Sequence, residues 1–414
     1  MKIQSLRGMP DLFPQDLERW HIFESKLSEV FYSFDTHEIR TPLLEPTELF
    51  SRSVGNSSDI INKELYSFLD RNKDSISLRP EGSASIIRAI IQKKQEHEKH
   101  KLWYQGPMFR YERPQKGRFR QFHQVGVEYL GFEEGVAEYE LISMVLQINK
   151  SIGISDYTIK INHLGDAKAK ESFCKSLVSF LSPHIEKLHE KDQARLKFNP
   201  LRVLDSKEQS TQDLLQSGPK FQDFISNESK NFLQNLVNTY SNHCNILIDQ
   251  TLVRGLDYYT GVVFEAVSKG LGAQDAFLGG GRYDKLSNQL GGKDMHAIGF
   301  AIGIERIVEL LNIKNIKSPK KVGFIVTAKQ ADQKTYKIAD DLRSTNKTII
   351  LDTFLNDGSL KSQLRRANKN NCTHVIIIGE EELKNNQIIW KDLSEGGKQE
   401  LLSPKEVIDK YINF

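Results

Sequence analysis

Cysteine is scarce in this sequence, because its 414 residues include only Cys174, Cys244 and Cys372. An odd number of widely separated cysteines argues against a disulfide framework or a cysteine zinc site, and it favours a reducing compartment. Long apolar runs are also missing, and the N-terminal sequence MKIQSLRGMPDLFPQ lacks the hydrophobic stretch of a secretory signal. We therefore predict a cytoplasmic protein that makes no membrane contact.

Neither sign of charge predominates, since 57 Lys and Arg against 54 Asp and Glu leave a net charge of +3. Any contact with nucleic acid must therefore come from local patches. The common ligand motifs are missing too. The eleven histidines form no HxxxH or HExxH pair, and the glycine-rich sequence LGGGRYDKL at 278–286 matches neither the P-loop nor the GxGxxG pattern.

The spacing of apolar residues divides the chain into two domains. Residues 1–311 alternate helices and strands irregularly, starting with an amphipathic helix over 16–34, which predicts an α+β domain. Within it, residues 166–243 are polar and helical, which indicates an inserted helical subdomain. The lysine-rich residues 312–321 are the predicted linker. In residues 322–414 strands and helices alternate, which predicts a small α/β domain with a largely parallel sheet.

A cationic segment joins two strand-like runs between Gly106 and Leu130, which we expect to form a β-hairpin. Its five basic residues lie within eleven positions that hold one acid, Glu112, and they are Arg110, Arg113, Lys116, Arg118 and Arg120. Strand alternation places Arg110 and Glu112 on one face of the first strand, and Gln124 and Glu128 on one face of the second. Such a segment suits a phosphate ligand. The alternative is an exposed hairpin with solvated charges.

Three further motifs carry candidate functional residues. In LVRGLDYYTG, a glycine beside Arg254 would let its guanidinium approach a phosphate closely, with Tyr258 and Tyr259 as a polar-tipped wall. The alternative is a turn that enters a strand, with an aromatic core. In RPEGSAS, Glu81 could hold an ammonium group, while Ser83 could contact the same ligand or simply cap a helix. In GIERIVEL, Arg306 opens a helix where it could reach an anion, or it could pair with a neighbouring glutamate.

Taken together, these segments resemble the class II histidyl-tRNA synthetase family, and the resemblance covers almost the whole chain. FRYE and GIER resemble motifs 2 and 3, which class II synthetases share, whereas LVRGLDYY and RPQKGRFRQFHQ resemble segments that mark the histidine enzymes. The resemblance implies an antiparallel sheet flanked by helices, an inserted helical subdomain and a C-terminal α/β anticodon-binding domain. It also implies a homodimer, with Pro42 at the dimer edge.

The resemblance implies a two-step reaction. The carboxylate of L-histidine attacks the α-phosphate of ATP, and the histidyl group then passes from the adenylate to the 3′ end of tRNA(His). Arg110 and Arg254 are the implied catalytic residues at the α-phosphate, and Arg254 takes a place that other class II enzymes give to a metal ion. Glu112 and Arg306 are implied in ATP binding, the latter at the γ-phosphate, and Mg²⁺ is expected to accompany the phosphates of ATP.

For the amino acid, the resemblance implies that Glu81 and Gln124 bind the α-ammonium group and that Glu128 and Tyr259 bracket the imidazole. The remaining implied contacts to histidine are Ser83, Tyr258 and Tyr283. Gln115, Lys116 and Arg118 are the implied contacts to the acceptor end of tRNA. Two departures from the family pattern stand out: the family usually has threonine in place of Ser83, and LGGGRYD carries three glycines where two are common.

Other functions compete with this interpretation. The regulatory subunit of ATP phosphoribosyltransferase resembles the same catalytic core and binds histidine without charging tRNA. Such paralogues usually lack the anticodon domain and part of the arginine set, whereas this sequence keeps Arg110, Arg254, Arg306 and residues 322–414. A synthetase for another amino acid is disfavoured by the combination of Glu128 with Tyr259. A pure RNA-binding protein would not require the acids expected to be buried.

Overall fold

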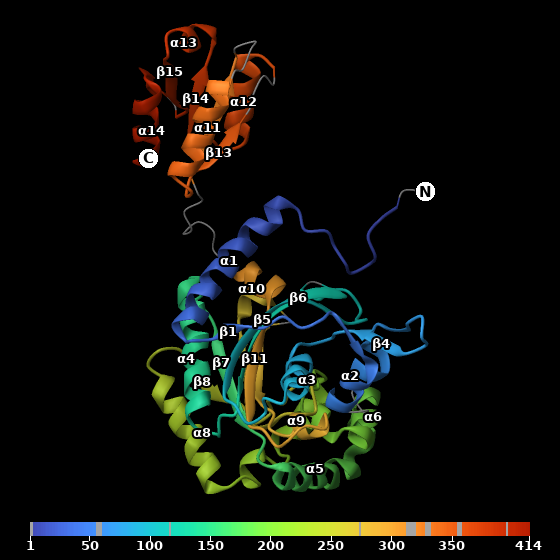
Figure 1. Cartoon of the computed structure of the whole chain (residues 1–414). Coiled ribbons are helices and arrows are strands. Elements are labelled where there is room, and N and C mark those ends of the chain that lie inside the picture. Colours follow the sequence, from blue (N-terminus) through green and yellow to red (C-terminus); the bar gives the residue numbers. More distant parts are fainter. Residues whose placement is uncertain are drawn as a thin grey trace. The chain divides into compact units, whose positions relative to one another are not determined.

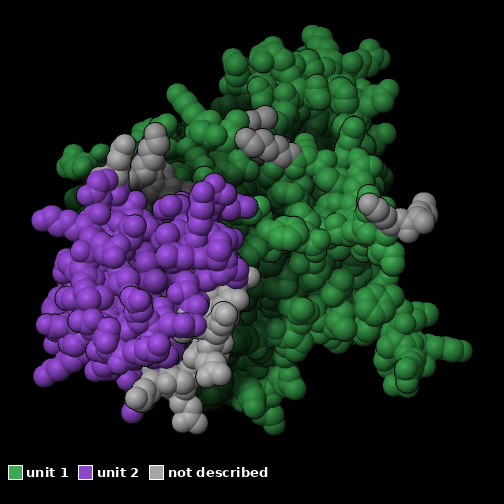
Figure 2. Space-filling view, turned by 90° about the horizontal axis from the view of Figure 1, so that it is seen from above, with its two compact units in different colours: residues 1–313 green, residues 314–414 purple. Residues whose placement is uncertain are grey.

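The computed structural model describes residues 3–54, 60–115, 117–272, 275–311, 320–327, 333–353, 358–394 and 396–414. The chain forms two compact units, Met1–Ile313 and Lys314–Phe414, shown in different colours in Figure 2. Residues 312–319 of the predicted linker lie outside the described residues. Within the described ranges, no helix is long and apolar enough to cross a membrane.

An eight-stranded sheet forms the centre of the first unit (Figure 1). Its strands, in spatial order, are β1 (His37–Glu38), β5 (His100–Phe109), β6 (Gln121–Leu130), β11 (Ala297–Gly303), β10 (Ala276–Arg282), β9 (Thr260–Val267), β7 (Thr158–His163) and β8 (Asn245–Ile248). All pairings from β5 to β7 are antiparallel, whereas the outermost pairs β1–β5 and β7–β8 are parallel. The predicted hairpin is the β5–β6 pair.

One face of this sheet is covered by α1 (Pro14–Ser33), α4 (Val136–Ser151), α8 (Asn227–Tyr240) and α10 (Ile304–Leu310). The predicted amphipathic helix is α1, which starts with proline at its first position and buries Trp20, Phe23 and Leu27. These side chains pack in one core with Val125 and Val127 of β6. Because strand residues alternate, Gln124, Gly126 and Glu128 point to the opposite face of the sheet.

Shorter elements, most of them from the first hundred residues, lie on the opposite face of the sheet. They are a three-stranded sheet of β2 (Leu44–Pro46), β4 (Ser75–Leu78) and β3 (Ser67–Leu69), the helices α2 (Thr47–Val54), η1 (Ile60–Glu64) and α3 (Ser83–Lys93), and α9 (Leu286–Gln289). Helix α3 ends at Lys93 because Lys94 adopts a left-handed conformation with φ of 58°. Ile86, Ile87 and Ile90 of α3 join the core on this side.

Helices and turns occupy the chain between β7 and β8. They are α5 (Ala167–Leu181), η2 (Ser182–Lys187), α6 (Glu190–Phe198), η3 (Pro200–Val203), α7 (Gln209–Gln216), η4 (Phe221–Asp223) and α8. Phe173 of α5 and Phe221 stack with their ring centroids 3.8 Å apart at the centre of this group. The last helix, α8, packs on the main sheet instead, because its Leu233 and Leu236 belong to the core beneath α1 and α4.

The second unit is a five-stranded sheet with helices. Its spatial order is β13 (Ile350–Thr353), β12 (Lys321–Val326), β14 (His374–Ile378), β15 (Ile388–Asp392) and β16 (Gln399–Leu402), and its helices are α11 (Gln333–Thr345), α12 (Leu360–Lys369), α13 (Glu380–Lys384) and α14 (Pro404–Ile412). The predicted parallel arrangement holds for β13, β12 and β14. It is wrong for β15 and β16, which pair antiparallel as a hairpin, and the strand β16 was not predicted.

Candidate active site

A cavity of about 650 Å³ opens on the face of the large sheet opposite α1 and α4. It brings together most of the residues singled out in the sequence: Glu81, Ser83, Arg110, Glu112, Arg118, Gln124, Glu128, Arg254, Tyr258, Tyr259, Tyr283 and Arg306. Gln115 is not among the lining residues: it is exposed in the loop after β5, where it pairs with Arg118 through backbone hydrogen bonds. Lys116 lies outside the described residues.

Arg110 enters the cavity from the loop that follows β5. The strand ends at Phe109: the amide of Arg110 still donates to the carbonyl of Arg120 at 2.9 Å, but the amide of Tyr111 turns away to the carbonyl of Glu64. The sequence-based placement of Arg110 and Glu112 on the face of this strand was therefore wrong. The Arg110 side chain is fixed by Nε, which donates to the carbonyl of Pro80 at 3.0 Å, and by the ring of Phe122, whose centroid is 5.2 Å from its guanidinium carbon.

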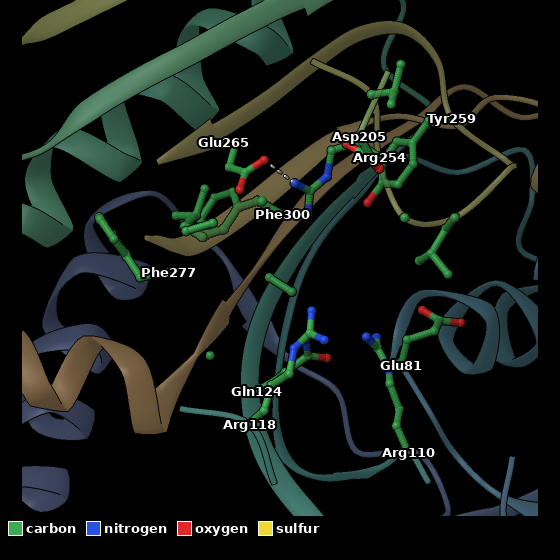
Figure 3. Close-up of a pocket in the computed structure, with 18 of the residues that line it drawn as sticks. Glu81, Arg110, Arg118, Gln124, Asp205, Arg254, Tyr259, Glu265, Phe277 and Phe300 are labelled. Carbon is green, nitrogen blue, oxygen red and sulfur yellow. Dashed lines mark hydrogen bonds and ion pairs between the residues drawn. The ribbon is translucent and has the colours of Figure 1, made fainter. Parts of the chain in front are cut away.

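Arg254 enters the same cavity from the loop between β8 and β9. In Figure 3 its guanidinium extends from the side opposite Arg110 and meets Glu265. The Nη1 atom donates to Oε2 of Glu265 at 2.8 Å, while the buried Nε has no hydrogen-bond partner. Burial acts to lower the pKa of Arg254, but the Glu265 carboxylate, together with Tyr259, Asp205 and Tyr258, outweighs burial and raises the pKa. Arg254 is therefore a permanent cation with donor capacity left for an anion.

The glycines of β10 and β11 let side chains lie directly on the sheet. A Cβ atom at Gly279 would overlap the guanidinium of Arg254, and one at Gly299 would overlap the carboxylate of Glu128. A Cβ at Gly280 would overlap the backbone of the neighbouring strand β11. Each of the three glycines of LGGGRYD thus has a structural reason: Gly279 leaves room for a functional side chain, whereas a Cβ atom at Gly280 or Gly281 would overlap the backbone of a neighbouring strand.

Arg306 lies at the start of α10 and points to the cavity. Its Nε donates to the carbonyl of Gly117 at 3.2 Å and its Nη1 to the carbonyl of Ala276 at 2.6 Å. Its sequence neighbour Glu305 is held elsewhere, because it accepts hydrogen bonds from the backbone N and Nδ1 of His123 at 2.8 and 3.0 Å. Burial lowers the pKa of Arg306, and the neighbouring cation Arg118 acts in the same direction.

Glu81 and Glu128 are connected through Ser83. The carboxylate of Glu81 accepts the backbone N–H groups of Ser83 at 2.6 Å and Ala84 at 3.0 Å, so Glu81, rather than Ser83, caps α3. The Ser83 hydroxyl donates to Oε1 of Glu128 at 2.6 Å, and the hydroxyl of Tyr283 donates to Oε2. The capping role considered for Ser83 is therefore wrong, and its hydroxyl faces the cavity with Glu128.

Both carboxyl groups titrate abnormally. Glu128 is 1% exposed, and burial raises its pKa from 4.5 to about 8 even though hydrogen bonds from Ser83 and Tyr283 act in the opposite direction. Burial also raises the pKa of Glu81. A carboxyl group whose pKa is moved to the working pH range by burial inside a cavity is a typical feature of a functional site.

Aromatic side chains form the wall beside Glu128. The ring centroid of Tyr258 lies 4.8 Å from that of Tyr259 and 5.4 Å from that of Tyr283. Tyr104 of β5 lies against Gly82 and Gly126, where a Cβ atom on either glycine would overlap its ring. Burial raises the pKa of Tyr104 well above its usual value, so its hydroxyl stays protonated.

Among the lining residues that the sequence analysis did not single out are Tyr104, Glu265 and Asp205. Tyr104 and Glu265 lie on strands whose alternation could have placed them on the cavity face. Asp205 follows η3, in the inserted helices, where no periodic signal points to the cavity. Burial raises its pKa, while Arg202 and Arg254 act to lower it.

The N-terminal segment supports the cationic loop. The carbonyl of Gly8 accepts the amides of Arg120 at 2.7 Å and Gln121 at 3.2 Å, at the position where the hairpin enters β6. The guanidinium carbon of Arg120 lies 3.8 Å from the ring centroid of Tyr111, and Arg118 pairs with Glu112 at 3.1 Å. The loop is thus ordered by contacts from outside the hairpin.

An antiparallel sheet that presents arginines and buried carboxyl groups above its face, followed by a separate α/β unit, defines a class II aminoacyl-tRNA synthetase. Comparison with known proteins agrees with this architecture. The sequence profile described as histidyl-tRNA synthetase matches residues 8–307, and the one described as anticodon binding domain matches residues 319–413. The chain therefore belongs to the histidyl-tRNA synthetase family.

Relatives in the family match over their full length. A histidine–tRNA ligase of Francisella philomiragia is 39% identical over 420 residues, covering 100% of this chain and 98% of the relative. One of Prochlorococcus marinus is 42% identical over 403 residues, covering 96% and 94% respectively. Among solved structures, apo histidyl-tRNA synthetase of S. aureus matches with a TM-score of 0.79 and 30% identity, covering 99% of this chain and 100% of that chain.

Proposed function

We propose that this chain is a histidine–tRNA ligase, which activates L-histidine with ATP to histidyl-adenylate and transfers the histidyl group to the 3′ end of tRNA(His). The observation that supports this most directly is the convergence of Arg110 and Arg254 on one cavity, from opposite sides, beside the buried Glu128. The similarity of the whole chain to histidine–tRNA ligases supports the same function.

Arg110 and Arg254 are the proposed catalytic residues of the first step. Attack of a carboxylate on the α-phosphate brings two anions together and develops further charge on the phosphate oxygens. Prepositioned cations stabilise that charge, and removal of one such donor typically costs about 10²- to 10³-fold in rate. Glu265 and Gly279 hold Arg254 ready for this role before ATP arrives.

The end of the cavity that holds Glu81 and Glu128 suits histidine. A neutral imidazole offers one donor and one acceptor, so Glu128 on one side and Tyr259 on the other would satisfy both nitrogens. Glu81 and Gln124 would bind the α-ammonium group. Among the described residues the buried Oε1 of Gln124 has no hydrogen-bond partner, which leaves an acceptor for that ammonium. Ser83, Tyr258 and Tyr283 complete the proposed pocket.

The end of the cavity that holds Arg306 and Glu112 suits the triphosphate of ATP. Arg306 is proposed at the γ-phosphate, and Glu112 is proposed to contribute to ATP binding. Mg²⁺ would enter with the nucleotide, because this ion is held mainly by substrate phosphates in such sites. The part of the chain that the structure describes contains no cluster of three His, Cys, Asp or Glu residues that could hold a metal ion by itself.

We assign the acceptor end of tRNA to the loop that carries Gln115, Lys116 and Arg118, and the anticodon to residues 322–414. Residues 1–311 are then the catalytic domain, with 166–243 as the inserted subdomain and 312–321 as the linker. A homodimer in the cytoplasm, with Pro42 near the dimer edge, completes the proposal. The alternative, a histidine-binding regulatory subunit of ATP phosphoribosyltransferase, is not favoured, because this chain keeps the anticodon-binding segment and all three arginines.

Histidine-dependent exchange of pyrophosphate into ATP tests the proposal. The purified chain should catalyse this exchange with L-histidine and not with the other amino acids. Arg254→Ala should reduce it by about 10²- to 10³-fold, as expected for loss of a catalytic cation. Arg71→Ala, at an exposed position in the turn between β3 and β4, is the matched control and should retain the activity. Equal exchange by Arg254→Ala and the unaltered protein would remove Arg254 from the mechanism.

A further inference from the structure

The loop that carries Arg254 and Tyr259 is held by side chains from the inserted helices. Lys170, in the first turn of α5, donates from Nζ to the carbonyl of Asp257 at 3.0 Å and to that of Tyr259 at 3.3 Å. Asn199 donates from Nδ2 to Oδ1 of Asp257 at 2.9 Å. Arg202, in η3, donates to the carbonyl of Gly255. Contacts from three separate insertion residues thus converge on one short loop.

Lysine at position 170 is electrostatically unfavourable for the helix itself. It lies four residues after Asp166, the N-cap of α5, near the helix start, where the helix dipole disfavours a cation. Burial also lowers the pKa of its ammonium group. The buried ammonium group is therefore compensated by its hydrogen bonds to the loop.

The loop needs such a donor. Residues 250–259 belong to no strand, so the carbonyls of Asp257 and Tyr259 lie outside the sheet ladder. The two carbonyls flank the peptide units that set the direction of Tyr258 and Tyr259. The ammonium group, with three donors, can join both carbonyls at once and fix the backbone between them.

We propose that Lys170 is a positioning residue for histidine activation: it connects α5 of the insertion to the loop and thereby fixes Tyr259 beside Glu128 and Arg254 beside Glu265. This inference rests on the proposed function. It assigns to the inserted helices a role in the first half-reaction, in which tRNA takes no part.

Lys170→Met tests the role, because methionine keeps a long unbranched side chain and removes all three donors. Histidine-dependent pyrophosphate exchange is measured per active site, after titration of active sites by adenylate formation. We expect kcat/KM for histidine to fall at least tenfold, with a smaller change in KM for ATP, because the ATP contacts of Arg110 and Arg306 come from other elements. Lys168→Met, exposed on the same helix, is the matched control and should behave as the unaltered protein. Lys170→Arg, which keeps donors at the end of a long chain, should recover most of the activity.

Asn199→Ala gives a second, milder variant if Lys170→Met does not fold. It removes one hydrogen bond to the side chain of Asp257 and should raise KM for histidine about threefold or more without changing KM for ATP. Activity per site in Lys170→Met equal to that of Lys168→Met would overturn the inference, as would a loss explained entirely by fewer active sites. Absence of histidine-dependent exchange in the unaltered protein would instead refute the proposed function.

Discussion

Replacing Glu128 by glutamine should stabilise the free protein while it abolishes efficient activation of histidine. Glu128 is buried, and its carboxyl is contacted by the hydroxyls of Ser83 and Tyr283. Since burial raises its pKa to about 8, the group is protonated in the folded protein at neutral pH and ionised in the unfolded chain. Glutamine is neutral in both states and has nearly the same shape.

The magnitude follows from the two pKa values. The folded protein binds a proton that the unfolded chain has lost between pH 4.5 and about pH 8, so the free energy of unfolding falls as the pH rises through that range. Each pKa unit corresponds to about 1.4 kcal/mol, which gives roughly 3 kcal/mol at pH 7. Glutamine does not titrate, so the variant avoids this loss of unfolding free energy. Its side chain has only one acceptor oxygen for the hydroxyls of Ser83 and Tyr283, so one hydrogen bond must be rearranged at a cost of about 1 kcal/mol. The net gain expected at pH 7 is about 2 kcal/mol.

Urea unfolding at several pH values measures the effect. A Trp390→Phe background restricts the fluorescence signal to Trp20 and Trp103, which both lie in the first unit. The stability difference between Glu128→Gln and its parent should rise from near zero at pH 5 to about 3 kcal/mol at pH 8. Glu133→Gln, at an exposed position near the end of the same hairpin, is the control and should show no comparable rise.

A stability difference that stays constant between pH 5 and pH 8 would refute the reasoning, because it would mean that Glu128 has an ordinary pKa in the folded protein. A destabilised Glu128→Gln at pH 8 would refute it as well. Kinetics supply the other half of the prediction: the stabilised variant should have a strongly raised KM for histidine in pyrophosphate exchange, because an amide cannot offer the imidazole an anionic acceptor.

Three further outcomes are expected. Gly279→Ala should displace Arg254 and reduce pyrophosphate exchange at least tenfold, but by no more than Arg254→Ala does. Full activity of Gly279→Ala would show that the guanidinium need not lie on the sheet. Histidine binding at pH 7 should release protons, because an imidazole donor favours the ionised form of Glu128. Calorimetry in buffers of different ionisation enthalpy would detect the released protons. A heat of binding that does not depend on the buffer would contradict this prediction. Deletion of residues 322–414 should reduce tRNA charging far more than adenylate formation, and equal losses would mean that this segment serves folding.

Local patterns in the sequence were sufficient for much of the fold. The three-to-four spacing around Trp20 and Phe23 identified α1, and alternation identified the β5–β6 hairpin with Gln124 and Glu128 on one face. Elements without such a pattern were missed. The strand β16, QELL, has no β-branched residue and is largely exposed, so its pairing with β15 depends on a tertiary partner that alternation cannot reveal.

The functional site was likewise only partly predictable from local sequence patterns. Motifs marked Arg110 and Arg254, but the residues that hold them were not visible locally. Glu265 meets Arg254 only because β9 lies beside β10, and Gly279 is needed only because a side chain from a distant loop lies over it. The helix cap was assigned to Ser83 as an alternative because serine is a common N-cap, whereas Glu81 reaches the same amides from two residues earlier.

The Gly8 carbonyl has a practical consequence for anyone who prepares this protein. Two amides at the entry to β6 rely on it, so trimming the first ten residues, or fusing a bulky tag that pulls them away, would leave those donors to water and loosen the base of the cationic loop. Side chains are also poorly tolerated there, since Gly8 has φ of +82° and a Cβ atom would press on Arg120 and Pro114 at 3.0 Å.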